Sequence, residues 1–226
     1  MSILFQDRKQ AGKELAIILE NYLQEKFSTV NNKDLIVLAI PRGGVIIGDI
    51  ISSHLGCNFD IIVTKKIGVE ENKELAIGAV LPDGSYILTE DIINTLNVSS
   101  EYIAKEVQIQ KLEVDRRLEE YRGNRAYDDK IKEKVVILVD DGIATGATII
   151  AASRWIKEKK DCKILIVAVP VIPSRNTTVS KLNQIANKVI SLYMPEQFYA
   201  VGQFYKEFNQ ISDEEVKAIM NKHIIN

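Results

Sequence analysis

The sequence is poor in the residues and patterns that mark several common protein classes. Its 226 residues include only two cysteines, Cys57 and Cys162, which provide neither a disulfide framework nor the spacing of a zinc site. The longest apolar run, Ile164 to Ile172, is interrupted by Pro170 and is far too short to cross a bilayer. We therefore expect neither a disulfide-stabilised secreted domain nor a membrane protein.

An excess of one charge and the common nucleotide-binding fingerprints are also missing. The 29 basic and 31 acidic residues give a net charge of −2, which offers no general attraction to nucleic acid, so no DNA partner is expected. Neither Gly-x-x-x-x-Gly-Lys-Ser/Thr nor Gly-x-Gly-x-x-Gly occurs, which argues against a P-loop nucleotidase and a dinucleotide-binding domain. The first eight residues contain no apolar signal-peptide core, so we expect a cytoplasmic protein.

Predicted strands and helices alternate along most of the chain. Apolar residues recur at helical spacing over residues 7–27, and the following segments read in turn as strand or helix. Strands are expected at 35–40, 60–64, 135–139, 164–169 and 189–192, and helices at 44–55, after the loop at 144–148 through Trp155, and at 176–185. This order predicts an α/β fold with a mostly parallel central sheet flanked by helices. We expect a single domain over 1–226, with a core at about 30–192 and a small C-terminal hood at about 193–226.

Residues 68–125 depart from this alternation. Pro82-Asp83-Gly84 separates two short apolar runs, 77–81 and 85–88, and this pattern predicts a hairpin. A long amphipathic helix is expected from Ser99 or Ser100 to Tyr121. We expect a mobile flap before the hairpin, at about 66–80.

The segment Val135–Thr148 carries the strongest functional signal. Five apolar residues are followed by Asp140 and Asp141, then by a loop of small and hydroxyl residues that leads into a helix. Such a loop offers backbone N–H groups to an anion, while the two carboxylates suit sugar hydroxyls or a metal ion. A buried strand, an Asp-Gly turn and a capped helix would explain each piece alone, but not the adjacent carboxylates before a loop almost free of bulky side chains.

This segment resembles the phosphoribosyl-pyrophosphate (PRPP) signature of the type I phosphoribosyltransferases. The resemblance implies that Asp140 and Asp141 hold the ribose hydroxyls and contact a metal, directly or through water. It also implies a 5-phosphate site formed by Ala144, Thr145, Gly146, Ala147 and Thr148. The type I phosphoribosyltransferase fold, which binds ligands at the carboxyl ends of its strands, agrees with the predicted α/β architecture.

Two further segments carry groups that suit an anion. Pro41-Arg42-Gly43-Gly44 follows the strand at 35–40, and Lys65 and Lys66 follow the strand at 60–64. An ordinary turn and solvated lysines would explain each segment in isolation. By resemblance they match the family's pyrophosphate-binding positions, here Arg42, Gly43, Lys65 and Lys66. The family often has a cis non-proline peptide in this loop, for which Arg42–Gly43 is our candidate.

The densest aromatic cluster lies at 198–205. Residues 199–202 resemble the C-terminal segment of purine phosphoribosyltransferases, which implies that Tyr199 stacks on a base and that backbone groups near Val201 contact the base edge. A hydrophobic lid on the core explains the cluster equally well. The loop carries Ala144 where 6-oxopurine enzymes carry an Asp, which argues against hypoxanthine or guanine as the acceptor.

Four segments are typical of a group of bacterial and archaeal proteins classed as phosphoribosyltransferases: the start at 5–8, the loop at 41–44, the stretch at 74–80 and the end at 198–202. Nearly the whole chain resembles this group. The resemblance implies Mg²⁺-dependent transfer of 5-phosphoribosyl from PRPP to a small-molecule nitrogen acceptor, with Asp140, Asp141, Arg42 and Lys66 as catalytic residues. One of Glu70, Glu71 and Glu74 in the flap would then assist proton transfer, although a solvated acidic loop explains each of them. A non-catalytic PRPP- or nucleotide-binding regulator is the alternative. Family members are commonly homodimers, and nothing in this sequence shows the oligomeric state.

Overall fold

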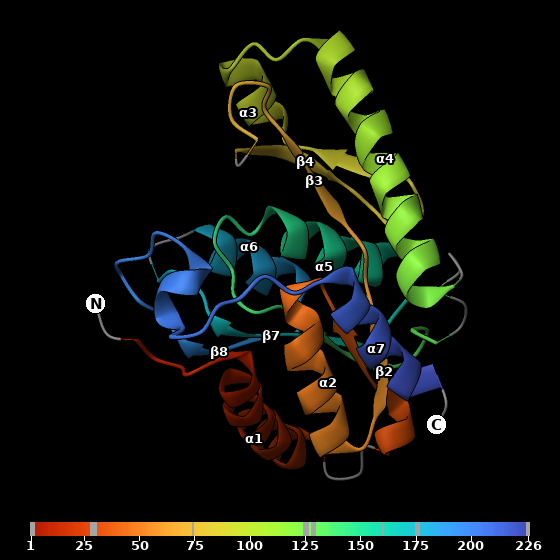
Figure 1. The fold of residues 1–226 in the computed structure, drawn as a ribbon, viewed down its shortest axis with the longest axis vertical. Coiled ribbons are helices and arrows are strands. Elements are labelled where there is room, and N and C mark those ends of the chain that lie inside the picture. Colours follow the sequence, from red (N-terminus) through yellow and green to blue (C-terminus); the bar gives the residue numbers. More distant parts are fainter. Residues whose placement is uncertain are drawn as a thin grey trace.

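The computed structural model describes residues 3–27, 31–73, 75–123, 127, 130–159, 161–174 and 177–224, which form two sheets with helices around them (Figure 1). The larger sheet has five parallel strands in the order β2-β1-β6-β7-β8. The smaller sheet has three antiparallel strands in the order β3-β4-β5. The strands are β1 (Leu35–Ala39), β2 (Asn58–Ile61), β3 (Lys65–Gly68), β4 (Ala76–Val80), β5 (Tyr86–Leu88), β6 (Val135–Val139), β7 (Ile164–Val171) and β8 (Lys188–Tyr193).

Helices cover both faces of the parallel sheet. The α-helices are α1 (Arg8–Lys26), α2 (Gly43–Leu55), α3 (Glu90–Thr95), α4 (Ser100–Arg122), α5 (Ala147–Lys159), α6 (Thr177–Ile185) and α7 (Asp213–Ile224), and short 3₁₀ turns are η1 (Asn32–Asp34) and η2 (Val201–Phe204). Helices α1 and α2 pack on one face, and α5 and α6 lie on the other (Figure 1). Among the described residues, no helix is long and apolar enough to cross a membrane.

The central strands consist of apolar residues because both of their faces are covered. Every residue of β1 and β6 is buried, and the two strands pair in register from Leu35 with Val135 to Ala39 with Val139. Val, Ile and Leu fill these positions except at Ala39, which suits strands without a solvent-exposed face. The predicted α/β fold with a mostly parallel central sheet is confirmed.

Residues 65–122 rise above this sheet as a separate lobe (Figure 1). The lobe contains the small sheet, α3 and α4, and the hairpin predicted around Pro82-Asp83-Gly84 is present as β4 and β5. Helix α4 begins where Ser99 accepts a hydrogen bond from the N–H of Tyr102, and its apolar face is buried along Val107, Val114 and Leu118.

The lobe corrects two details of the sequence prediction. Lys65 and Lys66 do not follow β2 directly, because β2 ends at Ile61 and the two lysines begin β3. The segment expected as a loop at 66–80 contains two paired strands, with Lys65 opposite Val80 and Lys66 opposite Ala79. This pairing depends on a partner outside the local sequence, which a reading of residues 60–66 alone does not reveal.

The lower end of α4 is fixed to the parallel sheet by a buried ion pair. Arg122 donates from Nε and Nη2 to the two carboxylate oxygens of Asp60, each at 2.8 Å. The guanidinium also stacks on the ring of Tyr127 at 3.9 Å, and the Tyr127 hydroxyl accepts from the N–H of Val63. The two charged side chains are only 4% and 7% exposed, so the contact ties the lobe rigidly to β2.

The C-terminal segment lies beside the body of the molecule and does not cover the lobe (Figure 1). Helix α7 packs against α2, α4 and β2. The segment at 204–207 pairs with the N-terminal segment, where Phe204 accepts from the N–H groups of Leu4 and Phe5, and Phe5 accepts from the N–H of Lys206. The predicted hood at 193–226 therefore differs from the raised lobe, which comes from the middle of the chain.

Candidate functional site

The parallel sheet places a cavity at the carboxyl ends of β1 and β6. These strands are neighbours, and the helices that follow them, α2 and α5, lie on opposite faces of the sheet, which leaves a crevice at this point. A cavity of about 330 Å³ occupies it. Its lining comes from five parts of the chain: Ile40 and Pro41, Thr64 to Lys66, Arg117, Asp140 with residues 142–149, and Val201.

The loop after β6, which the sequence predicts to bind an anion and which we call the anion loop, forms one wall of the cavity. Gly146 has a left-handed φ of +81°, and α5 begins at the next residue. The first N–H groups of a helix have no partner within the helix, so this loop and the start of α5 can donate to an anion. Thr178 of α6 supports the turn, because its hydroxyl donates to the Thr145 carbonyl at 3.1 Å. The structure therefore brings the predicted residues 144–148 together around the cavity.

Gly146→Ala is expected to weaken both this loop and its binding of ribose 5-phosphate. The left-handed φ costs a side chain about 1–2 kcal/mol. The added Cβ would also lie 2.3 Å from Cγ2 of Thr178, and such overpacking costs roughly a further 1–3 kcal/mol. Gly84→Ala is the matched control, because Gly84 has a φ of +77° and open space around it. Urea unfolding and ligand titration test this: equal losses of stability in the two variants, or unchanged binding for Gly146→Ala, would contradict it.

The two carboxylates of the acidic pair have different surroundings. Asp140 lines the cavity, and one of its oxygens accepts from the N–H of Asp141 at 2.8 Å. Asp141 is not among the cavity-lining residues, and its carboxylate is paired with Nε of Arg8 at 2.8 Å. The hydroxyl of Tyr205 donates to the Asp141 carbonyl at 2.6 Å. Asp141 is thus held by α1 and the C-terminal segment, whereas Asp140 faces the ligand space.

The electrostatics of the pair follow from burial and from like charge. Burial, and next the neighbouring charge of Asp141, raise the pKa of Asp140 well above its ordinary value. Burial also raises the pKa of Asp141, and Arg8 opposes that shift. The guanidinium of Arg8 lies 3.8 Å from the ring centroid of Phe208 and donates to the Asn209 carbonyl, so its position is fixed. Arg8 therefore supplies the charge that offsets the two adjacent carboxylates.

The loop after β1 packs directly against this acidic pair. A Cβ on Gly43 would lie 1.8 Å from a carboxylate oxygen of Asp141, and one on Gly44 would lie 2.9 Å from Cα of Asp140. Glycine is required here for close packing within the protein itself. The cis non-proline peptide bond lies at Pro41–Arg42, one residue before the candidate Arg42–Gly43, a distinction between neighbouring bonds that the sequence does not make.

The side chain of Arg42 contacts α7 and is not among the residues that line the cavity. Its Nη1 lies 3.3 Å from Asp213, and the Tyr121 hydroxyl donates to the same carboxylate at 2.6 Å. The hydrogen bond from Tyr121 and the one from Arg42 lower the pKa of Asp213. Arg42 thus links the loop after β1 to α7 and, through Tyr121, to α4.

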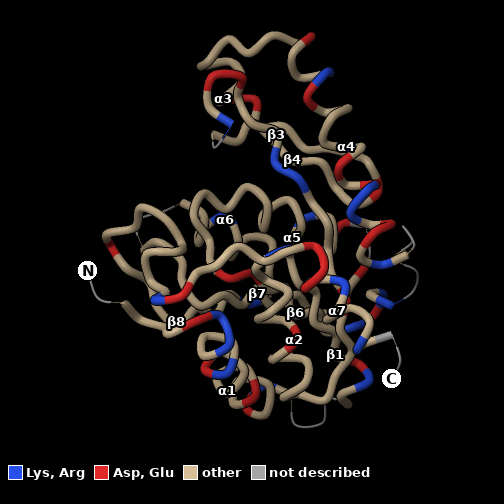
Figure 2. Tube along the Cα trace, in the orientation of Figure 1, with Lys and Arg blue, Asp and Glu red and all other residues tan. Residues whose placement is uncertain are grey.

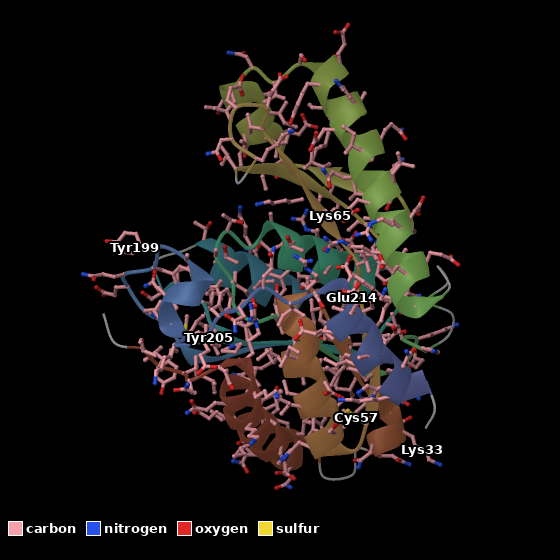
Figure 3. The ribbon with its side chains drawn as sticks, in the orientation of Figure 1. Lys33, Cys57, Lys65, Tyr199, Tyr205 and Glu214 are labelled. Carbon is pink, nitrogen blue, oxygen red and sulfur yellow. The ribbon has the colours of Figure 1, made fainter. Side chains whose placement is uncertain are left out.

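The basic side chains that line the cavity belong to the lobe. Lys65 and Lys66 line it from β3, and Arg117 lines it from α4. Figure 2 shows basic residues at the base of β3 beside the alternating charges of α4, and Figure 3 shows Lys65 between the lobe and α5. Burial, and next the nearby charge of Arg117, lower the pKa of Lys65. The cations therefore lie close enough to repel one another without a ligand.

The predicted base-contacting residues are separated. Val201 lines the cavity, and its Cγ1 would lie 2.6 Å from a Cβ on Gly142. Tyr199 is 76% exposed, is not among the lining residues and projects at the outer edge of the molecule (Figure 3). Of the flap acids, Glu70 and Glu71 are exposed, and Glu74 lies outside the described residues. The stacking role of Tyr199 stays a prediction.

Four residues of the site were not predicted from the sequence as parts of it: Arg8, Thr64, Arg117 and Tyr205. Arg8 and Arg117 occur on amphipathic helices, where a charged residue usually marks a solvated face. Their low exposure, 9% and 15% of the side chain, is a property of the folded chain. For Arg8 alone, the sequence contains a local feature that could have drawn attention to it, because Asp7-Arg8 stands at the start of a helix.

The residues that line the cavity could hold Mg²⁺ through one carboxylate and the phosphates of a substrate. Within the part of the chain that the structure describes, no group of three or more His, Cys, Asp or Glu side chains could enclose a metal ion. Mg²⁺ usually keeps several waters and binds through one or two carboxylates together with phosphates of a substrate. Asp140, the carboxylate that lines the cavity beside the anion loop, is suited to this arrangement.

Known proteins are similar to this chain in sequence and in fold. A model of the phosphoribosyl transferase domain matches residues 6–207. A protein of Mycobacterium tuberculosis strain H37Rv named "Putative phosphoribosyl transferase" is 34% identical over 221 residues, which are 97% of this chain and 47% of the relative. The chain spans about half the length of the curated relatives it matches. The protein TT1426 from Thermus thermophilus is 32% identical, with 97% of this chain and 98% of that chain covered and a TM-score of 0.76.

A more distant solved structure shows a weaker likeness. The adenine phosphoribosyltransferase of Giardia lamblia complexed with 9-deazaadenine is 14% identical, covers 82% of this chain and 80% of its own, and has a TM-score of 0.48. A likeness at this level carries no argument about the acceptor. The match to the domain model shows the family, because it covers most of the chain. The matched residues include the anion loop, the acidic pair and the basic residues of the cavity. The chain belongs to the phosphoribosyl transferase family.

Proposed function

We propose that this protein transfers the 5-phosphoribosyl group of PRPP to a nitrogen atom of a small-molecule acceptor, a nucleobase, in a Mg²⁺-dependent reaction that releases pyrophosphate. One observation carries the proposal: a single cavity is lined by the start of a helix, one carboxylate, and three cations from two other elements, β3 and α4. PRPP has the matching groups, namely a phosphate, two ribose hydroxyls and a pyrophosphate. Membership of the family supports the same reaction.

Each end of PRPP is assigned to a different wall of the cavity. The N–H groups and hydroxyls of residues 144–148 hold the 5-phosphate. Asp140 accepts from the ribose hydroxyls, while Asp141 fixes the loop through Arg8 and Tyr205. Lys65, Lys66 and the backbone at 42–43 hold the pyrophosphate. Arg42 contributes to this loop through its backbone and its ion pair with Asp213.

The chemical step breaks the bond between C1 of the ribose and a pyrophosphate oxygen, and forms a bond between C1 and the acceptor nitrogen. The electron pair of the broken bond leaves with pyrophosphate, and the acceptor nitrogen loses one proton to a base or to solvent. The protein contributes by positioning C1 and by neutralising charge on the leaving group. Lys65 and Lys66 perform the second task because both line the cavity.

A magnesium ion would be held by Asp140 through water and by oxygens of PRPP, with Asp141 as a more distant contributor. When bound, it neutralises part of the pyrophosphate charge and helps it to leave. Asp140 orients the ribose whether or not its oxygen is bridged to the metal by water. The apolar residues Ile143, Ile149 and Val201 limit the access of water to the same space.

The acceptor site is assigned to the side of the cavity that Val201 lines. Gly142 and Val201 pack closely there, so η2 lies directly against the anion loop. Tyr199 would stack on the base only after a rearrangement of residues 193–200 toward the cavity, because its ring is exposed in the present arrangement. Ala144 continues to argue against a 6-oxopurine acceptor.

The test is pyrophosphate release from PRPP and Mg²⁺ across a panel of purines, pyrimidines and related heterocycles. Release that depends on one base, with formation of its ribonucleotide, is the expected result and identifies the acceptor class. PRPP binding without release for any member of the panel would favour the alternative, a non-catalytic regulator on the same fold. Absence of PRPP binding in the presence of Mg²⁺ would overturn the proposal for this cavity.

A further inference from the structure

We propose that Arg117 of α4 binds the pyrophosphate group directly. We propose also that the hydroxyl of Thr64 forms a hydrogen bond with the same pyrophosphate group. This inference rests on the proposed function and adds to it a binding residue from a part of the chain that carries no phosphate-binding motif. The two residues line the same cavity as Lys65 and Lys66 but belong to separate elements.

Arg117 differs sharply from the adjacent Arg116. The side chain of Arg117 is 15% exposed and lines the cavity, whereas that of Arg116 is 46% exposed and lies on another face of α4. Arg116 is engaged by three carboxylates, those of Glu113, Glu120 and Asp213. Successive residues on a helix point in directions about 100° apart, so only one of the two arginines can face the ligand.

The guanidinium of Arg117 has hydrogen-bonding capacity left for a ligand. Its Nε donates to Glu113 at 2.7 Å, which orients the side chain, and its two Nη groups have no hydrogen-bond partner among the described residues. Such a group can donate two parallel hydrogen bonds to a phosphate. Glu113 thus acts on Arg117 as an orienting residue and leaves the free edge of the guanidinium for the cavity.

Thr64 provides an independent observation. The residue is 6% exposed and lines the cavity, and within the described part of the chain its Oγ1 is buried without a hydrogen-bond partner. An unsatisfied buried hydroxyl is costly to a folded protein and calls for an explanation. A ligand oxygen in the cavity would satisfy it. Because Lys65 lines the same cavity, that oxygen would also lie near a positive charge.

The positive charge on this side of the cavity suits the pyrophosphate group of PRPP better than its 5-phosphate or its ribose. Lys65, Lys66 and Arg117 supply three cations, and Asp140 is the one acidic residue among those that line the cavity. The 5-phosphate already has the N-terminal end of α5, and the ribose hydroxyls need a carboxylate as acceptor. Pyrophosphate carries the highest charge density of the substrate and matches a cluster of repelling cations.

Arg117 is also held in place before any ligand binds. Arg122, five residues later on the same helix, forms the buried ion pair with Asp60 that fixes the lower end of α4 to β2. The cation therefore comes from the anchored end of α4 and not from the connection between β3 and β4. Such preorganisation avoids the entropy cost of ordering a flexible arm on binding.

The test measures binding of pyrophosphate with Mg²⁺, and of ribose 5-phosphate, by calorimetry for the full chain and four variants. Arg117→Gln is expected to raise the Kd for pyrophosphate at least about tenfold, since a charge-assisted hydrogen bond is lost, and to leave the Kd for ribose 5-phosphate within about threefold. Arg117→Lys should recover part of the loss. Arg116→Gln is the matched control and should bind both ligands as the parent does.

The outcomes separate this inference from the proposed function. If the parent binds pyrophosphate and ribose 5-phosphate but Arg117→Gln behaves like Arg116→Gln, the assignment of Arg117 is wrong and the proposed function stands. If Arg117→Gln weakens both ligands equally, the residue has a structural role and the inference is overturned. Thr64→Val, which keeps the shape of the side chain, should weaken pyrophosphate binding selectively, and unchanged binding would remove Thr64 from the site. A parent that binds neither ligand would overturn both proposals.

Discussion

Arg122→Met is expected to lower the free energy of unfolding by about 3–5 kcal/mol, because it leaves the buried carboxylate of Asp60 without its counter-charge. Asp60 accepts two hydrogen bonds from the guanidinium and one from the N–H of Ile61. Methionine fills much of the arginine volume and keeps an apolar contact with Tyr127, so the loss reports mainly on charge and hydrogen bonds. Urea unfolding followed by circular dichroism measures it.

A control variant and a double variant show whether this loss comes from the buried ion pair. Arg116→Met removes an exposed arginine from the same helix and should cost less than about 1 kcal/mol. The double variant Asp60→Leu with Arg122→Met removes both charges and should recover much of the lost stability, since a buried ion pair is often replaceable by apolar residues. A loss below about 1 kcal/mol for Arg122→Met alone would mean that water reaches Asp60 in the folded protein.

The second large effect is expected in catalysis. Asp140→Asn should reduce transfer by about 10²–10³-fold, a range typical for the loss of one electrostatic group at a reacting centre. Asparagine retains an oxygen that can accept from the N–H of Asp141, so the loop is preserved while the charge is lost. Steady-state pyrophosphate release with the acceptor found in the panel measures the effect. Activity within threefold of the parent would remove Asp140 from the ribose site.

The same variant should not lose stability at neutral pH. Burial and the charge of Asp141 raise the pKa of Asp140, so its ionised form destabilises the folded state and this cost develops as the pH rises above the ordinary pKa of aspartate. Asp140→Asn removes that cost and should melt at the same temperature as the parent or higher. Asp141→Asn is the contrasting variant: burial raises the pKa of Asp141 as well, but Arg8 opposes that shift and loses its carboxylate in the variant, so its melting temperature should rise less than that of Asp140→Asn.

The parts of the fold that follow local rules could be predicted from the sequence. The apolar run at 135–139 forms a fully buried strand, Gly56 ends α2 in a left-handed conformation, and Ser99 caps α4. The start of β3 could not be predicted in this way. Lys65 and Lys66 have the composition of a strand end, and only their pairing with Val80 and Ala79 makes them part of a strand.

For the site, the sequence indicated the segments but not the directions of their side chains. Neighbouring residues in extended chain point to opposite sides, so the sequence cannot tell which member of Asp140-Asp141 faces a ligand. The structure distinguishes them through Arg8, which is 133 residues away from Asp141. Arg42 is a similar case, because its charge suggested a ligand while Asp213 of α7 is its partner. Long-range ion pairs of this kind leave no local pattern.

The pairing of the N-terminal segment with residues 204–207 has a consequence for the order in which the protein matures. During synthesis Arg8 leaves the ribosome early, but Tyr205, the ring of Phe208 and the carbonyl of Asn209 follow about two hundred residues later. All strands of the parallel sheet precede these residues in the chain. The sheet can therefore assemble while the acidic pair still lacks part of its surroundings, which are completed only after residues 205–209 have been synthesised.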